Sequence, residues 1–160
     1  HQSIYEGDRG TDVNIRSYMQ SLIHRILATM TPSSNIVDSK LEIEEHYLPM
    51  RTAFPVGLIT TETVMNAVRH GFGFPDSRTS SIGMSQEKKT LRVGLCKENG
   101  KFRLYVTNNG NQFPEDLDVT NIESMGLQLV RELTEQLEGT LTIHADSGWT
   151  TFRIEFPTAV

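Results

Sequence analysis

The sequence predicts an α+β fold, a two-layer sandwich in which a mixed, mostly antiparallel sheet carries helices on one face. Stretches with the apolar period of an amphipathic helix are interspersed with stretches in which every second residue is apolar. The strand-like stretches are joined in pairs by tight turns, and this order of helices and hairpins is typical of such sandwiches. The length of 160 residues suits a single domain with a full core.

The first helix is expected to begin at Asp12, whose carboxylate can accept a hydrogen bond from a first-turn amide. Pro32 ends this helix, because proline cannot continue it. One face is apolar at intervals of three and four residues. That face consists of Ile15, Tyr18, Met19, Leu22, Ile23, Ile26, Leu27 and Met30. Residues 40–49 then alternate apolar and charged side chains and predict a half-exposed strand.

The second helix is expected at residues 55–71. Pro55 suits its first helical position and Gly71 suits its C-terminal cap. Residues 73–89 are rich in Ser, Gly and Lys and predict a loop, with a short strand at 82–84.

Two hairpins are predicted. The stretch 91–106 contains two alternating runs around Asn99-Gly100, a pair that supplies the positive φ angles of a tight turn. The last hairpin is expected at residues 140–157, with its turn at 146–148.

A third helix is expected at residues 124–139, after a polar loop at 111–123. Ser124 can cap the start of this helix, and Gly139 can end it. Its apolar residues again follow the helical period.

Charge and composition exclude several classes of function. The net charge of -5 argues against a nucleic-acid partner held by phosphate contacts, which needs a basic face. The single cysteine, Cys96, cannot form an internal disulfide and is expected to be a buried free thiol. No apolar stretch has the length of a membrane span. The chain begins without Met, so we expect it to be a piece of a longer protein.

One segment of the second helix groups polar side chains that suit a metal–triphosphate. At ~100° per residue, Glu62, Asn66 and Arg69 share one stripe, and His70 adjoins it. An amide oxygen suits Mg²⁺, a guanidinium suits phosphate, and a carboxylate can hold a water near the metal. The alternative is that Glu62 and Arg69 stay solvated and that Asn66 bonds a neighbouring strand.

Two further segments are ambiguous when each is taken alone. Asn108-Asn109-Gly110 places side-chain amides and a flexible backbone after a strand, as a binding loop or as a plain turn. Gly126 lies just inside a predicted helix start, where uncovered N–H groups can bind an anion. The alternative is a glycine that only permits close packing.

As a set, these segments resemble the ATP-binding domain of sensor histidine kinases, within the GHKL ATPases that also include gyrase, heat-shock chaperones and mismatch-repair proteins. "LITTETVMNAVRHGF" resembles the N box, "VTNNGNQFP" the first glycine box, and "SMGLQLVRELTEQLEGTLTI" the second glycine box. "GWTTFRIEFP" is similar to the closing strand, and the N-terminal segment is similar to the HWE-like branch. The resemblance implies the Bergerat-type ATPase fold. It also implies that residues 1–11 are the end of a dimerisation helix and a linker, and that 12–160 are the ATP-binding kinase domain.

The resemblance implies roles on the phosphate side of an ATP site. Asn66 would be the Mg²⁺ ligand, and Glu62 would be the catalytic residue that holds water near the γ-phosphate. Arg69 stands where the family has a basic residue facing the phosphates, and His70, next to it, would also contact the nucleotide. Residues 111–124 would form a lid that closes over ATP.

It also implies roles at the helix start and on the base side. Gly126 and Leu127 would begin the helix whose amides meet the phosphates. Gly110 would let the backbone approach adenine, and Thr150 would bond adenine directly or through water. Asn108 stands where the family has the Asp that accepts a hydrogen bond from the adenine amino group.

Four positions depart from the family pattern. Asn108 keeps an acceptor oxygen but loses the charge of the family's Asp, and a charge-assisted hydrogen bond is about twice as strong as a neutral one. Gln112, Met125 and Trp149 replace glycines. The phosphate side is therefore expected to be preserved and the base side to be altered.

The resemblance implies a histidine protein kinase that transfers the γ-phosphoryl group of Mg-ATP to a histidine outside this fragment. Its partners would be the dimerisation and phosphoacceptor domain of the same protein and, indirectly, a response regulator. The full-length protein would be a homodimer whose ATP-binding domain is cytoplasmic, with membrane attachment left open. One alternative is a degenerate protein-interaction or phosphotransfer module with weak or no ATP binding. Another is an anti-sigma-type serine kinase, which the N-terminal segment argues against.

Overall fold

The computed structural model describes residues 11–33, 35–74, 88–110 and 127–158. Its main sheet has five strands in the order β2-β4-β5-β7-β6. The strands are β2 (Val37–Ile43), β4 (Lys89–Glu98), β5 (Lys101–Asn108), β6 (Thr140–Asp146) and β7 (Trp149–Pro157). The helices are α2 (Ile15–Met30), α3 (Met50–Asn66) and α4 (Gln128–Gln136), with a π-helical turn η1 (Ala67–Gly71) after α3.

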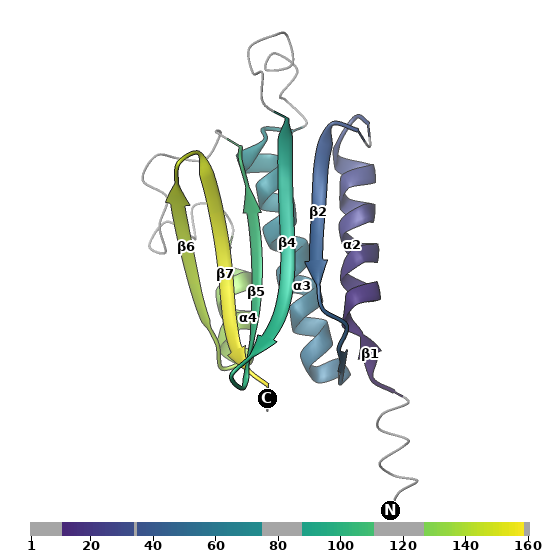
Figure 1. Ribbon diagram of the computed structural model, residues 1–160, viewed down its shortest axis with the longest axis vertical. Coiled ribbons are helices and arrows are strands. Elements are labelled where there is room, and N and C mark those ends of the chain that lie inside the picture. The colour runs from purple at the N-terminus through teal and green to yellow at the C-terminus, as the bar shows by residue number, and fades with distance from the viewer. Residues whose placement is uncertain (1–10, 34, 75–87, 111–126, 159–160) are drawn as a thin grey trace, which may run out of the picture.

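The sheet is mixed but mostly antiparallel. β2 pairs with β4 in parallel, whereas the β4–β5, β5–β7 and β6–β7 pairs are antiparallel. Figure 1 shows the three helices behind the sheet, on one of its faces. The predicted two-layer α+β sandwich is confirmed.

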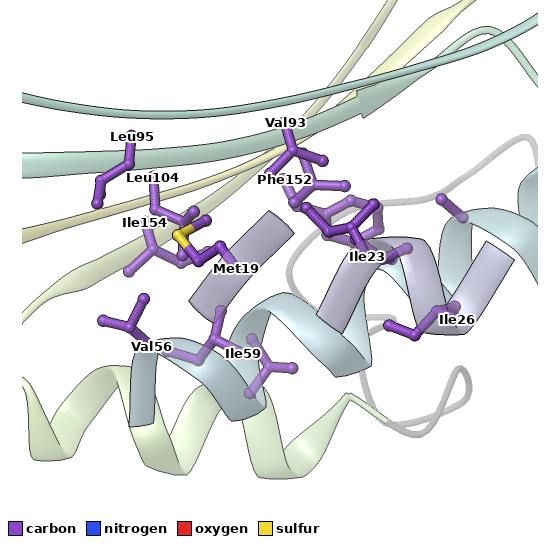
Figure 2. Close-up of a cluster of buried hydrophobic side chains, with 14 of the residues drawn as sticks. Met19, Ile23, Ile26, Val56, Ile59, Val93, Leu95, Leu104, Phe152 and Ile154 are labelled. Carbon is purple, nitrogen blue, oxygen red and sulfur yellow. The ribbon is translucent and has the colours of Figure 1, made fainter. Parts of the chain in front are cut away.

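The core lies between the helices and the sheet. Figure 2 shows side chains of α2 and α3 directed toward side chains of the central strands. The labelled members of this cluster are Met19, Ile23, Ile26, Val56, Ile59, Val93, Leu95, Leu104, Phe152 and Ile154. Full burial of one such side chain contributes about 1.5–3 kcal/mol, so this layer holds the two halves together.

Two of the three predicted helix starts need correction. Asn14 caps α2, since its side chain accepts a hydrogen bond from the Ser17 amide at 3.1 Å. Asp12 cannot do so, because residues 13–14 form the short strand β1 (Val13–Asn14), which pairs with β3 (Tyr47–Leu48). α3 begins at Met50, five residues before the expected start, and Pro55 therefore lies inside the helix.

Both predicted hairpins are confirmed. Asn99 and Gly100 have φ angles of 55° and 77°, and the second turn has φ angles of 53° at Ser147 and 84° at Gly148. The strand expected at 40–49 is wrong in its bounds, because β2 begins at Val37 and β3 is a separate strand. The expected strand at 82–84 and the Ser124 cap lie outside the described residues.

Gly139 has a different role from the one predicted. The left-handed residue after α4 is Glu138, with φ of 57°, and the Gly139 amide bonds the Thr134 carbonyl at 2.9 Å. A Cβ at Gly139 would overlap the carbonyl oxygen of Glu155 on β7. Glycine is needed here for close approach to the sheet.

Cys96 is half-buried, whereas the sequence predicts a buried thiol.

Candidate functional site

The α-helical part of α3 ends at Asn66, and a π-helical turn follows. The Phe72 amide bonds the Ala67 carbonyl at 2.8 Å, five residues earlier. The angle predicted for Arg69 from a regular α-helix therefore does not apply. Asn66 is buried, whereas Arg69 is exposed and His70 is half-buried. Single π-helical turns are frequent at functional sites.

Asn66 holds its side-chain amide in one orientation. Its Nδ2 donates a hydrogen bond to the Glu62 carbonyl at 2.7 Å, and a carbonyl can only accept, so the opposite arm is the oxygen. The residue is 2% exposed, and its Oδ1 has no partner among the described residues. The alternative that Asn66 bonds a neighbouring strand is wrong.

An unsatisfied buried acceptor costs about 1–3 kcal/mol, so such an atom in a folded protein calls for an explanation. A ligand that supplies a cation or a donor is one such explanation. The chemistry of an amide oxygen fits Mg²⁺, which takes oxygen ligands.

Three charged or titratable groups accompany Asn66. Glu62 lies one turn earlier on α3 and is half-buried. Burial lowers the pKa of His70 below its ordinary value of 6.5, and the positive charge of Arg69 lowers it further. A neutral imidazole at physiological pH can donate to or accept from a ligand.

Asn108 and Thr150 form the sheet side of the candidate site. They are register partners at the end of β5 and the start of β7. Both side chains are buried, at 0% and 6% exposed, and they follow the alternation of residues that face the helices. On the face that packs against the helices, the row of buried side chains thus ends in a polar residue on both β5 and β7.

The Asn108 amide is also held in one orientation. Its Oδ1 accepts a hydrogen bond from the Gly110 amide at 2.9 Å. A backbone N–H can only donate, so the opposite arm is the NH₂ group. That Nδ2 is buried and has no partner within the described part of the chain.

The segment after β5 is no plain hairpin turn, because neither neighbour of β5 directly follows it in sequence. Asn109 ties the segment to β4: its Oδ1 accepts from the Thr90 amide and its Nδ2 donates to the Lys88 carbonyl, both at 2.8 Å. Gly110 lies so close to η1 that a Cβ would overlap the carbonyl of Gly71.

These contacts bring the end of β5 against the end of η1, at the end of the molecule that is uppermost in Figure 1. The sequence reasoning missed the anchoring role of Asn109 and the contact role of Gly71. The repeated Asn before a glycine was the available signal for Asn109.

The departure at Trp149 does not enter this site. Alternation along β7 places Trp149 on the face opposite to Thr150, the face that carries no helix. The guanidinium of Arg92 lies over its ring at 5.4 Å, within the range of a cation–π interaction. The side chain of Trp149 therefore lies on the face opposite to that of Asn108 and Thr150.

Leu127 is fully buried and immediately precedes α4. It offers no side-chain cap, so the first-turn N–H groups of this helix are not capped by that residue. The predicted positions Gly126, Gln112 and Met125 and the predicted lid at 111–124 lie outside the described residues.

Other features of the described residues do not compete with this site. They contain no group of three or more His, Cys, Asp or Glu side chains that could hold a metal. Two shallow hollows on the sheet are lined by Glu98, Asn99, Lys101, Arg103 and Glu155, and by Thr142, His144, Thr151 and Arg153, none of them a predicted site residue. Within the described parts of the chain, no helix has both the length and the apolar character needed to cross a membrane.

The chain matches a family model. The model is described as histidine kinase-, DNA gyrase B- and HSP90-like ATPase, and it matches residues 53–160. A similar curated protein is blue-light-activated histidine kinase 2 of Erythrobacter litoralis, which is 29% identical over 110 residues. The match covers 69% of this chain and 29% of that protein, so the chain spans under a third of this relative.

Solved structures of histidine kinases share the fold. The histidine kinase domain of a blue-light-activated histidine kinase from Erythrobacter litoralis superimposes with a TM-score of 0.74 at 21% identity, over 92% of this chain and 62% of that one. The nucleotide-free catalytic domain of the histidine kinase ThkA gives a TM-score of 0.64 at 15% identity, over 92% of this chain and 95% of that one. The predicted resemblance to histidine-kinase ATPase domains is confirmed.

Proposed function

Since the chain belongs to the histidine kinase-, DNA gyrase B- and HSP90-like ATPase family, we propose that it is the ATP-binding catalytic domain of a sensor histidine kinase. The domain would bind ATP, as the family implies, and transfer its γ-phosphoryl group to a histidine outside this chain. Catalysis of such a transfer is mainly positioning and charge stabilisation. The likeness to histidine kinases in both sequence and fold supports this proposal over a degenerate interaction module.

One observation carries the proposal: the Oδ1 of Asn66 is buried and has no partner among the described residues. The side chain is oriented by its own helix, so the oxygen stays available without a partner from the sheet. A bound Mg²⁺ would neutralise phosphate charge, and Asn66 would hold it. Glu62, one turn away, would orient a water or a reacting group beside the metal.

The other predicted residues have supporting roles in this proposal. Arg69 is exposed and free to reach toward phosphates, and His70 beside it is kept neutral by burial and by that charge. The first turn of α4, which the side chain of Leu127 does not cap, would face phosphate oxygens with N–H groups, and Gly126 would precede it. Thr150 and Gly110 would contact the base.

The base side fits adenine less well than the phosphate side fits Mg²⁺. The Oδ1 of Asn108 accepts a hydrogen bond from the Gly110 amide, and the side-chain atom left without a partner among the described residues is the donor Nδ2. The amino group of adenine is also a donor, and two donors cannot bond each other. We therefore expect weaker ATP binding than a carboxylate at position 108 would give.

The proposed partners follow from the same assignment. A catalytic domain of this kind needs a phosphoacceptor histidine, which the dimerisation domain of the same protein would supply. We propose that the full-length protein is a homodimer that acts on a response regulator through that histidine. The domain itself would work in the cytoplasm, where ATP is available.

Calorimetric titration tests the proposal. Mg-ATP is titrated into the wild-type chain, into Asn66→Ala, and into Asn35→Ala as a control at an exposed asparagine. We expect Asn66→Ala to weaken Mg-ATP binding by roughly tenfold or more, since a metal ligand is lost. ATP in EDTA should bind both proteins about equally, because Asn66 then has no metal to hold.

Two outcomes contradict the proposal. If Mg-ATP does not bind the wild-type chain, the degenerate interaction module replaces the kinase domain. If Asn66→Ala retains the full effect of Mg²⁺ on affinity, then Asn66 is not the metal ligand.

A further inference from the structure

The open atom on the base side of the site is a hydrogen-bond donor. Asn108 is completely buried, and its Nδ2 has no partner among the residues that the structure describes. A buried donor without a partner costs about as much as a lost hydrogen bond. A ligand that offers an acceptor at this point would therefore gain a hydrogen bond and relieve that cost.

The side-chain amide of Asn108 cannot turn by 180° without losing a hydrogen bond. Turning it would place the NH₂ group against the Gly110 N–H, which would lose the 2.9 Å hydrogen bond and set two donors face to face. Gly110 cannot move away easily, since it lies against the backbone of Gly71. Asn109, the residue before Gly110, is held by two side-chain hydrogen bonds, one to Thr90 of β4 and one to Lys88 just before that strand.

Purines differ in what they offer at position 6. Adenine carries an amino group there, a donor, whereas guanine carries a carbonyl oxygen, an acceptor. Hypoxanthine carries the same carbonyl. The neighbouring ring nitrogen, N1, is an acceptor in adenine and a donor in guanine and hypoxanthine. A threonine hydroxyl such as that of Thr150 can bond either form.

We propose that this chain binds 6-oxopurine nucleoside triphosphates, those of guanine or hypoxanthine, more tightly than ATP, because the Nδ2 of Asn108 donates to the carbonyl at position 6 of the base. The inference rests on the proposed function, which places position 108 beside the base. Asn108 is the specificity-determining residue. ATP also binds, although more weakly, because the contacts to the metal and the phosphates do not depend on the base.

The probe that isolates this contact is inosine triphosphate, which keeps the ribose and phosphates of ATP and carries a carbonyl at position 6. Mg-ITP and Mg-ATP are titrated separately into the wild-type chain. We expect Mg-ITP to bind on the order of tenfold more tightly, the value of one buried hydrogen bond. Asn108→Asp, which replaces the donor by an acceptor, should reverse the preference toward Mg-ATP.

A matched control separates position from charge. Asn99→Asp makes the same change in the exposed turn between β4 and β5, where aspartate also tolerates the positive φ of 55°. It should leave the ratio of the two affinities unchanged. An equal shift in Asn99→Asp would make the effect one of net charge and overturn the inference.

The wild-type ratio decides the matter even if Asn108→Asp does not fold. If the wild-type chain binds Mg-ATP more tightly than Mg-ITP, the inference is wrong and the proposed function stands. If neither nucleotide binds, the proposed function fails and the inference fails with it.

Discussion

Asn66 and Asn108 are the same residue type, are both buried, and each leaves one side-chain atom without a partner in the described structure. At the end of α3 the open atom is an oxygen, and at the end of β5 it is a nitrogen. The first offers an acceptor to a cation or donor, and the second offers a donor to an acceptor.

The difference arises from the local backbone. In a helix the carbonyl four residues earlier lies beside the side chain, so the NH₂ group of Asn66 donates to the Glu62 carbonyl. Where the chain turns after a strand, the N–H two residues later lies beside the side chain, so the side-chain oxygen of Asn108 accepts from the Gly110 amide. The backbone, rather than the residue type, decides what an asparagine presents to a ligand.

The largest effect is expected for Gly110→Ala, because Gly110 lies where the segment after β5 contacts the end of η1. The new Cβ would overlap the carbonyl of Gly71, and backbone on both sides must shift. We expect a loss of about 1–3 kcal/mol in the free energy of unfolding. Binding of Mg-ATP and Mg-ITP should weaken together, because the shift displaces Asn108 and η1.

Urea denaturation and calorimetry measure both effects. Gly100→Asn is the control, because nothing lies near a Cβ at Gly100 and asparagine accepts its φ of 77°. Equal behaviour of the two variants would show that Gly110 is not confined by Gly71.

The next prediction concerns stability alone, whereas Gly110→Ala affects both stability and binding, and it separates the two asparagines directly. Asn108→Leu leaves the Gly110 amide without its partner and should cost about 1–3 kcal/mol in unfolding free energy. Asn66→Leu removes an unsatisfied buried oxygen, while the Glu62 carbonyl keeps its bond in the α-helix, so we expect no loss or a small gain. Urea denaturation without nucleotide measures both. Equal losses in the two variants would contradict the contrast between them.

The smallest effect concerns His70, in the π-helical turn that follows Asn66. Its pKa is lower in the folded chain than the ordinary 6.5, so the unfolded chain binds more protons just below that pH. The stability contribution is therefore full above pH 6.5 and is lost as the pH falls through the lowered pKa. Arg69→Gln should raise the pKa of His70, since the charge of Arg69 lowers it.

An NMR titration of the His70 ring in both proteins checks this prediction. A His70 pKa at or above 6.5 in the wild-type chain would show that neither burial nor Arg69 acts on this side chain as the structure indicates.

Much of the fold was predictable because its signals are local. The turns at Asn99-Gly100 and Ser147-Gly148 and the alternation of the strands beside them appear in the structure as expected. The helix starts were not predictable in the same way. The cap of α2 is Asn14 instead of Asp12, two residues later, because Val13 and Asn14 pair with β3, more than thirty residues along the chain.

The candidate site divides along the same line. The residue types and their phase were readable from the sequence, since Asn108 alternates with the apolar residues of β5 and so faces the helices. The angle of Arg69 was not readable, because no local signal marked the π-helical turn after Asn66.

The sequence by itself determined which side chains face the space between the layers, because that depends only on the periods of strands and helices. Only the tertiary structure decided which atom each buried amide leaves open and where the two amides stand relative to each other. Those outcomes depend on contacts between distant segments, Gly110 against Gly71 and Asn109 against β4. No local pattern encodes such contacts, because each needs two parts of the chain to be already in place.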